Sequence, residues 1–320
     1  MSRILVGTTS WTEKTLVESG RFYPPDVHTA EAPLRFYASE FPVVEVDSSY
    51  YGLPSSRNAS LWAERTPDGF VFDIKAYRLF TQHQTPPDAL PKNIRERLAP
   101  VEKKNLYYKD MPAEVLDELW ARFRSALDPL RSTGKLGVVL FQFAPWFVFR
   151  PSSLGLIAAF VERLPGDRIA VEFRNKSWFA EKHLAETIAF EREHGLIHVV
   201  VDEPQGFPSS VPAVWKATSP DVAIARLHGR NRATWAKKGI SAAERFNCLY
   251  SDEELREFAG SVNRLGGHVK ELHVLFNNCY RDNAAGAETR AQRVPRAVFP
   301  RPSSALRRAA RRFRTQADAA

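Results

Sequence analysis

The sequence lacks several features that would identify a class of protein directly. Only two of its 320 residues are cysteine, Cys248 and Cys279, and they are far from any paired spacing. This excludes a disulfide framework and a Cys-rich zinc site, and it favours a reducing, cytoplasmic compartment. The most apolar stretch, 136–149, contains Gln142 and Pro145 and is too short to cross a bilayer, which takes about 20 helical residues. We therefore expect neither a secretion signal nor a membrane association.

Motifs that bind phosphates, cofactors or metals at fixed spacing are also missing. No Gly-x-Gly-x-x-Gly turn follows a strand pattern, and there is no P-loop, Gly-x-Ser-x-Gly elbow or His-Glu-x-x-His helix. These absences argue against a dinucleotide-binding doubly wound sheet, the main alternative fold. The sequence carries no signal for an oligomeric state.

The net charge of +8 belongs to the end of the chain. Residues 284–320 contain nine Arg and two acidic residues, so this tail carries +7 and the other 283 residues carry only +1. A nearly neutral body gives no electrostatic support for a nucleic-acid-binding domain. The tail has eleven Ala and little apolar periodicity, and we expect it to be disordered or weakly helical.

The body alternates short β-branched runs with longer amphipathic ones, which is typical of a parallel sheet with crossover helices. Eight strands are predicted, at 4–7, 43–46, 71–74, 137–141, 169–172, 197–201, 222–227 and 272–276. Helical patterns occupy 32–40, 57–65, 112–130, 154–162, 182–193 and 252–265. We predict an α/β fold, a TIM-type (β/α)₈ barrel over 1–283, followed by the 284–320 tail. Residues 79–111 form a long connection after the third strand, a position where loops often serve as lids.

Polar side chains follow the predicted strands at the points where the strands end. In a TIM barrel, these carboxyl-terminal ends are where active sites are built. Alternate residues of a strand share one face, so Glu172 and Arg174 lie on the same side of theirs. Because unpaired buried charges are costly, so many charged ends indicate a functional site. The predicted set is Glu45, Lys75, Gln142, Glu172, Arg174, Asp202, Arg226, His228 and Asn277.

Four members of this set are the catalytic candidates: Glu45, Glu172, Asp202 and His228. Two carboxylates and an imidazole could act as general acid and base. The same four could bind a divalent metal, although no short ligand spacing specifies one. The structural alternative is that pairs such as Glu172 with Arg174, or Asp202 with Lys75, are ion pairs that close the barrel.

The remaining candidates are assigned to substrate binding. Three cations at the strand ends favour an anionic group on the ligand, such as phosphate or carboxylate. Aromatic residues just past the strand ends, among them Tyr51, Trp146 and Trp235, fit a planar or sugar-like ligand. The substrate-binding candidates are Trp11, Tyr50, Lys75, Gln142, Arg174, Trp178, Arg226 and Asn277.

Ordered blocks along residues 3–282 resemble the YecE-like family, domain-of-unknown-function family 72. The blocks include GTTSW at 7–11, FYP at 22–24, EVDSSYY at 45–51, FQF at 141–143, EFR at 172–174, RLHGR at 226–230 and FNN at 276–278. The resemblance implies a TIM-type barrel and no established reaction. Members of the family usually end in a helix that closes the barrel. The Arg- and Ala-rich tail does not resemble that helix, which predicts a divergent C-terminus or a shifted reading frame.

The leading hypothesis is an enzyme of the hydrolase or isomerase class. It would use acid-base chemistry, metal-assisted if an ion binds, on a small anionic or sugar-phosphate-like substrate. One alternative is a nucleic-acid-binding protein or an endonuclease-like phosphodiesterase. Another is a barrel that binds a ligand without turnover.

Overall fold

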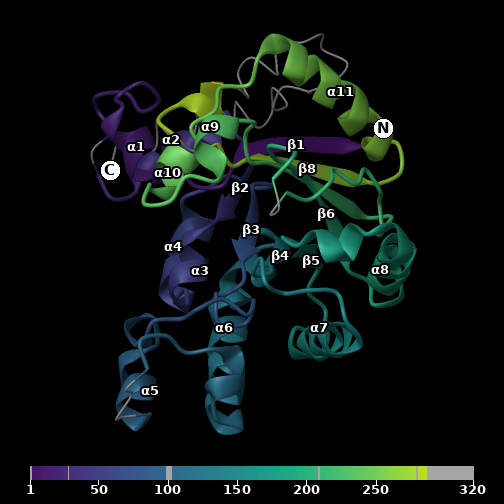
Figure 1. Cartoon of the computed structure of the whole chain (residues 1–320). Coiled ribbons are helices and arrows are strands. Elements are labelled where there is room, and N and C mark those ends of the chain that lie inside the picture. The colour runs from purple at the N-terminus through teal and green to yellow at the C-terminus, as the bar shows by residue number, and fades with distance from the viewer. Residues whose placement is uncertain (1, 28, 99–102, 208–209, 279, 287–320) are drawn as a thin grey trace.

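The computed structural model describes residues 2–27, 29–98, 103–207, 210–278 and 280–286 (Figure 1). Eight parallel strands close into a barrel in chain order, with the last strand paired to the first. The strands are β1 (Arg3–Thr8), β2 (Val43–Val46), β3 (Val71–Lys75), β4 (Leu136–Gln142), β5 (Ile169–Glu172), β6 (Ile197–Asp202), β7 (Val222–Leu227) and β8 (Glu271–Phe276). The predicted TIM-type barrel is confirmed, and each predicted strand is present to within one residue at either end.

Helices surround the strands (Figure 1). They are α1 (Lys14–Glu18), α2 (Ala32–Glu40), α3 (Ser48–Tyr51), α4 (Ser56–Glu64), α5 (Lys92–Arg97), α6 (Ala113–Ser132), α7 (Pro151–Arg163), α8 (Glu181–Glu193), α9 (Arg232–Trp235), α10 (Ala242–Arg245) and α11 (Asp252–Gly266). All six predicted helices are among them. Within the described residues, no helix has both the length and the apolar character needed to span a membrane.

Local sequence signals explain where the longest of these helices begin. Ser251 caps α11, because its side chain accepts a hydrogen bond from the backbone N–H of Glu254, and the Glu254 carboxylate accepts one from the N–H of Ser251. This reciprocal pair satisfies two donors that a helix start leaves free. α6 starts directly after Pro112, and its buried residues recur at helical spacing along the side that faces the sheet.

Alternate strand residues enter two separate cores. On β1, Leu5 joins the cluster that fills the barrel, whereas Val6 joins a cluster between strands and helices. The inner cluster comprises Leu5, Val43, Val71, Val138, Leu140, Ala170, Ile197, Val199, Val201, Val211, Val222, Ile224 and Leu275. This alternation defines which side chains point into the barrel, and therefore which polar residues can face one another above the apolar layers.

Two connections depart from a regular strand–helix repeat. The connection after β3 contains two short 3₁₀ helices (Pro87–Ala89 and Tyr108–Asp110), α5, and an antiparallel bridge between Thr85 and Leu106. α5 is tied to α6, since Arg122 donates to the side chain of Asn93 at 3.0 Å. Between β6 and β7, the described residues contain no helix.

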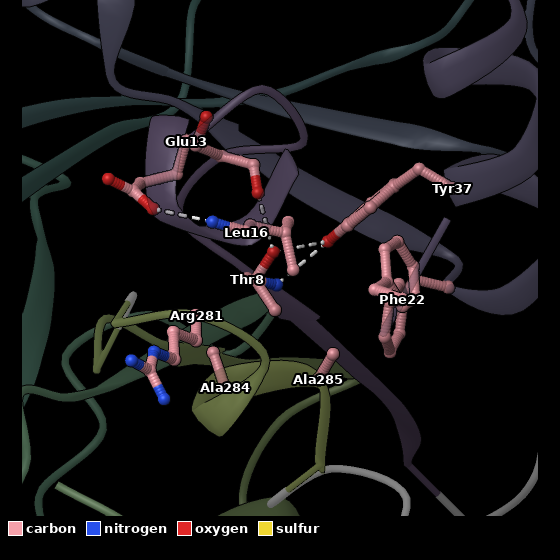
Figure 2. A pocket seen from close by; sticks show the side chains of 10 residues that line it. Thr8, Glu13, Leu16, Phe22, Tyr37, Arg281, Ala284 and Ala285 are labelled. Carbon is pink, nitrogen blue, oxygen red and sulfur yellow. Dashed lines mark hydrogen bonds between the residues drawn. The ribbon is translucent and has the colours of Figure 1, made fainter. Parts of the chain in front are cut away.

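The chain after β8 returns to the start of the barrel. Residues 283–286 are helical, and Ala284 and Ala285 are buried. Figure 2 shows both alanines near Thr8, which is hydrogen-bonded to the Tyr37 hydroxyl, and these residues and Phe22 line a cavity of about 10 Å³. This volume suffices for about one water molecule. The predicted tail lies outside the described residues from 287 onward, so the boundary at 283 and the altered closing helix stay predictions.

Candidate active site

A fully buried ion pair network lies at the carboxyl-terminal opening of the barrel, which we call the mouth. Arg226 follows Val222 and Ile224 on the inward face of β7, one step above the apolar layers. Its Nε and Nη2 donate to the two carboxylate oxygens of Glu45 on β2, at 2.8 and 2.7 Å. Its Nη1 donates to Glu172 on β5, and none of the three side chains is exposed. Arg226 is therefore held by two strands of the protein itself.

The two carboxylates that share the Arg226 guanidinium differ in acidity. Burial raises the pKa of Glu45 to about 7, against the opposing charges of Arg226 and Lys75. Burial alone would also raise the pKa of Glu172, but Arg226 and His228 hold it well below its usual range. Glu172 is thus ionised near neutral pH, whereas Glu45 titrates there. Two carboxyl groups with separated pKa values suit a division into acid and base.

His228 lies next to this network and is neutral. Its Nε2 is 3.3 Å from Oε1 of Glu172, and its Nδ1 is 2.6 Å from Nδ2 of Asn277. The hydroxyl of Thr9 donates to Oδ1 of Asn277, which leaves the Asn277 amide group as the donor toward His228. The neutral imidazole therefore carries its proton on Nε2, which lies near Glu172 but has no hydrogen-bond partner among the described residues. Burial lowers the pKa of His228 to about 3, although Glu172 opposes this.

Two partly exposed residues, Gln142 and Arg174, lie above the buried network. Gln142 donates to Oε1 of Glu172 at 2.6 Å. Arg174 contacts the same oxygen at 3.2 Å and Glu203 at 2.8 Å, and its guanidinium lies 5.6 Å from the ring centre of Trp235. These contacts bring the predicted residues Gln142, Glu172 and Arg174 together.

The opposite side of the mouth is cationic. Nζ of Lys75 binds Asp47 at 2.6 Å and lies 4.7 Å from the ring centre of Tyr50, and the guanidinium of Arg78 lies 5.2 Å from that ring. His83 packs edge-on against Tyr50 at 5.1 Å. Burial, together with the positive charges of Lys75, Arg78 and Arg174, lowers the pKa of His83 to about 3. Three cations therefore act on one neutral imidazole.

Sequence reasoning missed Arg78, His83, Asp47 and Glu203. Arg78 pairs with no carboxylate among the residues that the structure describes, and its buried Nε has no hydrogen-bond partner there. Their position in the sequence could have identified Arg78 and His83, because both follow β3 in the long connection at the carboxyl-terminal end of the barrel. Glu203 was passed over in favour of its neighbour Asp202.

Asp202 lies apart from the network. Val199 and Val201 point into the barrel, so Asp202 at the next position points outward. Its carboxylate accepts hydrogen bonds from Arg230 at 2.9 Å and from the Tyr250 hydroxyl at 2.9 Å. That hydroxyl in turn accepts the backbone N–H of Gly229, whose φ of +89° turns the chain after His228. Asp202 thus supports the turn that follows His228.

Two predicted aromatic residues pack in the protein interior. Trp178 is fully buried, stacks on Phe173 at 3.8 Å and donates its indole N–H to the carbonyl of Phe147. Trp11 is partly buried and packs edge-on against Trp62 at 5.7 Å in the outer core. Of the three aromatic residues assigned to substrate binding, Tyr50 is the one that contacts mouth cations, and Trp235 of the wider aromatic set contacts Arg174.

In the described part of the chain, no group of three or more His, Cys, Asp or Glu residues is placed so that it could hold a metal ion. Glu45 and Glu172, which the metal hypothesis requires as ligands, bind Arg226 instead.

Comparison with known proteins adds relatives with the same fold. A family model described as "Protein of unknown function DUF72" matches residues 5–306. UPF0759 protein YunF of Bacillus subtilis is 32% identical over 285 residues, which cover 88% of this chain and 91% of that protein. A DUF72 family structure from Thermotoga maritima has a TM-score of 0.71 and 30% identity, covering 91% of this chain and 98% of that one. One from Enterococcus faecalis has a TM-score of 0.74 and 26% identity, covering 91% and 94%.

Proposed function

The chain belongs to the DUF72 family, as its sequence motifs predict, and from this premise we propose that the mouth is the active site of an enzyme that transfers a proton on a small anionic substrate. The family description assigns no reaction, so the proposal depends on the geometry of the mouth.

The observation that carries the proposal is that Arg78 has no carboxylate partner among the described residues. Lys75 is balanced by Asp47, and Arg174 by Glu172 and Glu203. Arg78 has no such carboxylate within the described residues, yet its Nε is buried beside the ring of Tyr50. A phosphate or carboxylate would supply the missing charge and hydrogen-bond acceptors. Lys75 and Arg174 would contact the same anion, and Gln142 and Asn277 would orient the substrate.

The proton-transfer step is assigned to His228 and the glutamates beside it. Nε2 of the neutral His228 lies 3.3 Å from Glu172 and has no hydrogen-bond partner among the described residues, so its N–H would donate to a substrate oxygen while the ionised Glu172 would accept the substrate proton. Glu45, with a pKa of about 7, exists in both protonation states near neutral pH. Substrates with a proton that is removed and replaced, as in an isomerisation, or hydrolysable anionic esters, fit this arrangement.

A second candidate is a barrel that binds an anion without turnover. Both oxygens of Glu45 and both of Glu172 already accept hydrogen bonds from protein donors. Saturated carboxylates of this kind suit a rigid binding site as well as a catalytic one.

One experiment separates the two candidates. Binding of ribose 5-phosphate and inorganic phosphate is measured calorimetrically, and a panel of pentose and hexose phosphates is incubated in D₂O and followed by NMR for deuterium uptake or hydrolysis. We expect Arg78→Met to weaken phosphate binding about tenfold, which is the loss of about 1.4 kcal/mol. Lys92→Met, at an exposed position of α5, is the matched control.

The variant His228→Gln should bind ribose 5-phosphate as the wild type does. Loss of deuterium uptake or hydrolysis in this variant supports the enzyme. Binding without either reaction in the wild type supports the non-catalytic barrel. If the wild type binds no phosphate compound, or if Arg78→Met and Lys92→Met bind equally well, the anionic substrate class is wrong.

A further inference from the structure

A groove of about 400 Å³ lies beside the mouth, between the connection that follows β3 and the start of α7. Its lining includes Gln82, Tyr107, Lys109, Trp146, Arg150 and Ser152. None of these residues takes part in the buried network of the mouth. The volume falls within the range of small-molecule sites.

The groove has an aromatic wall that is exposed and fixed in orientation. Trp146 is 52% exposed, which is unusual for so large an apolar side chain. Its indole N–H donates to the carbonyl of Gln82 at 3.1 Å, and its ring packs edge-on against His83 at 5.9 Å. These two contacts hold the ring in place while much of its surface stays open. A fixed, exposed ring suits stacking by a planar group.

The groove also offers hydrogen-bond donors and positive charge. The side-chain amide nitrogen of Gln82 is buried and has no hydrogen-bond partner among the described residues. The backbone of Gln82 has a φ of +65°, a left-handed conformation that non-glycine residues rarely adopt and that is frequent at binding sites. Lys109 and Arg150 are exposed and pair with no carboxylate in the described part of the chain. Among the described residues that line the groove there are donors and cations but no carboxylate.

We propose that this groove binds an aromatic anion, a planar ring joined to a phosphate or carboxylate. The ring stacks on Trp146, the anionic group lies between Lys109 and Arg150, and the amide of Gln82 donates to a ring or linker acceptor. An uncharged ring would leave the two cations unused, and an anion without a ring would leave Trp146 uncovered.

The groove goes beyond the proposed function of the mouth. Its own aromatic ring, cations and donor are complete without Lys75, Arg78 or Arg174. The link between the two sites is His83, which contacts Trp146 on one side and Tyr50 on the other. The His83 ring therefore lies between the aromatic wall of the groove and the Tyr50 ring of the mouth.

The test uses two probes that differ by one planar base. Adenosine 5′-monophosphate carries a planar base, a ribose and a phosphate, and ribose 5-phosphate is the same molecule without the base. Affinities of the full-length protein for both are measured calorimetrically. We expect the nucleotide to bind at least fivefold more tightly, a low value for stacking of one base on an aromatic side chain. Trp146→Ala should remove that advantage, Trp146→Phe should keep most of it, and Lys109→Met should weaken the nucleotide severalfold. Lys92→Met is the control.

The outcomes separate the groove from the mouth. Loss of nucleotide binding in Trp146→Ala and Lys109→Met, with Lys75→Met unaffected, supports the groove, whatever the mouth does. Loss in Lys75→Met alone places the nucleotide in the mouth and overturns the inference. Nucleotide affinity that Trp146→Ala leaves unchanged, or no binding of the nucleotide, overturns it as well. Circular dichroism of each variant establishes that it is folded, and Trp146→Phe provides the test if Trp146→Ala is not.

Discussion

Replacement of Arg226 by methionine should destabilise the barrel more at alkaline than at mildly acidic pH. The variant keeps the volume of the side chain but removes the three hydrogen bonds to Glu45 and Glu172, whose side chains have no exposure to water. Removing one partner of a buried ion pair typically costs about 3–5 kcal/mol, because the remaining charge is left uncompensated. That is a large part of the roughly 5–15 kcal/mol that stabilises most domains.

The pH dependence follows from the two carboxyl groups that remain. Without Arg226, burial raises the pKa of both above the value of about 4.3 in the unfolded chain. A group whose folded pKa is raised in this way lowers stability at every pH above its unfolded pKa. The deficit of the variant should therefore be larger at pH 8 than at pH 5, where protonation of the buried carboxyls relieves it.

Urea unfolding followed by tryptophan fluorescence at the two pH values measures this difference. Glu45→Gln added to Arg226→Met should restore part of the lost stability, since it removes one unpaired charge. Arg97→Met, which breaks an ion pair with Glu118 on the surface, should have little effect because water screens that pair. A deficit below about 1 kcal/mol, or one that is equal at both pH values, would refute the assignment of Arg226 as the buried counter-charge.

Two further predictions concern the lower part of the barrel. Burial alone would lower the pKa of His273, but Asp73 and Glu271 raise it to about 9. The stability that protonated His273 adds to the folded protein is therefore fully present below about pH 6.5 and is lost as the pH rises through 9. Urea unfolding of His273→Gln should show a larger deficit at pH 6 than at pH 10, and equal deficits would contradict this. A Cβ at Gly137 would lie 2.2 Å from Oδ1 of Asp73, so Gly137→Ala should lower the free energy of unfolding by about 1–3 kcal/mol. A Cβ at Gly155 in α7 would meet free space, so Gly155→Ala should raise the free energy of unfolding by about 0.5–1 kcal/mol. Thermal unfolding measures both variants, and the reverse order of stability would be inconsistent with the packing.

The sequence by itself determined the barrel fold and showed that the mouth residues lie at the carboxyl-terminal ends of the strands. Eight β-branched runs separated by amphipathic helices predict the strands within a residue, because burial on both faces requires nearly continuous apolar segments. The same runs break into charge where the strands end, which placed Glu45, Glu172 and Arg226 at one level. The family motifs reinforced these positions without supplying a reaction.

Only the tertiary structure decided which of these residues face one another. The strand 197–201 is apolar on both faces except for His198, so its alternation does not reveal that Glu203 points inward and Asp202 outward. Arg226 and Glu45 are 181 residues apart, and nothing local to either indicates that they bind. Closure of the barrel brings distant strands together, and the pairing of their charges is a property of that closure, because side-chain partners depend on register and direction in space.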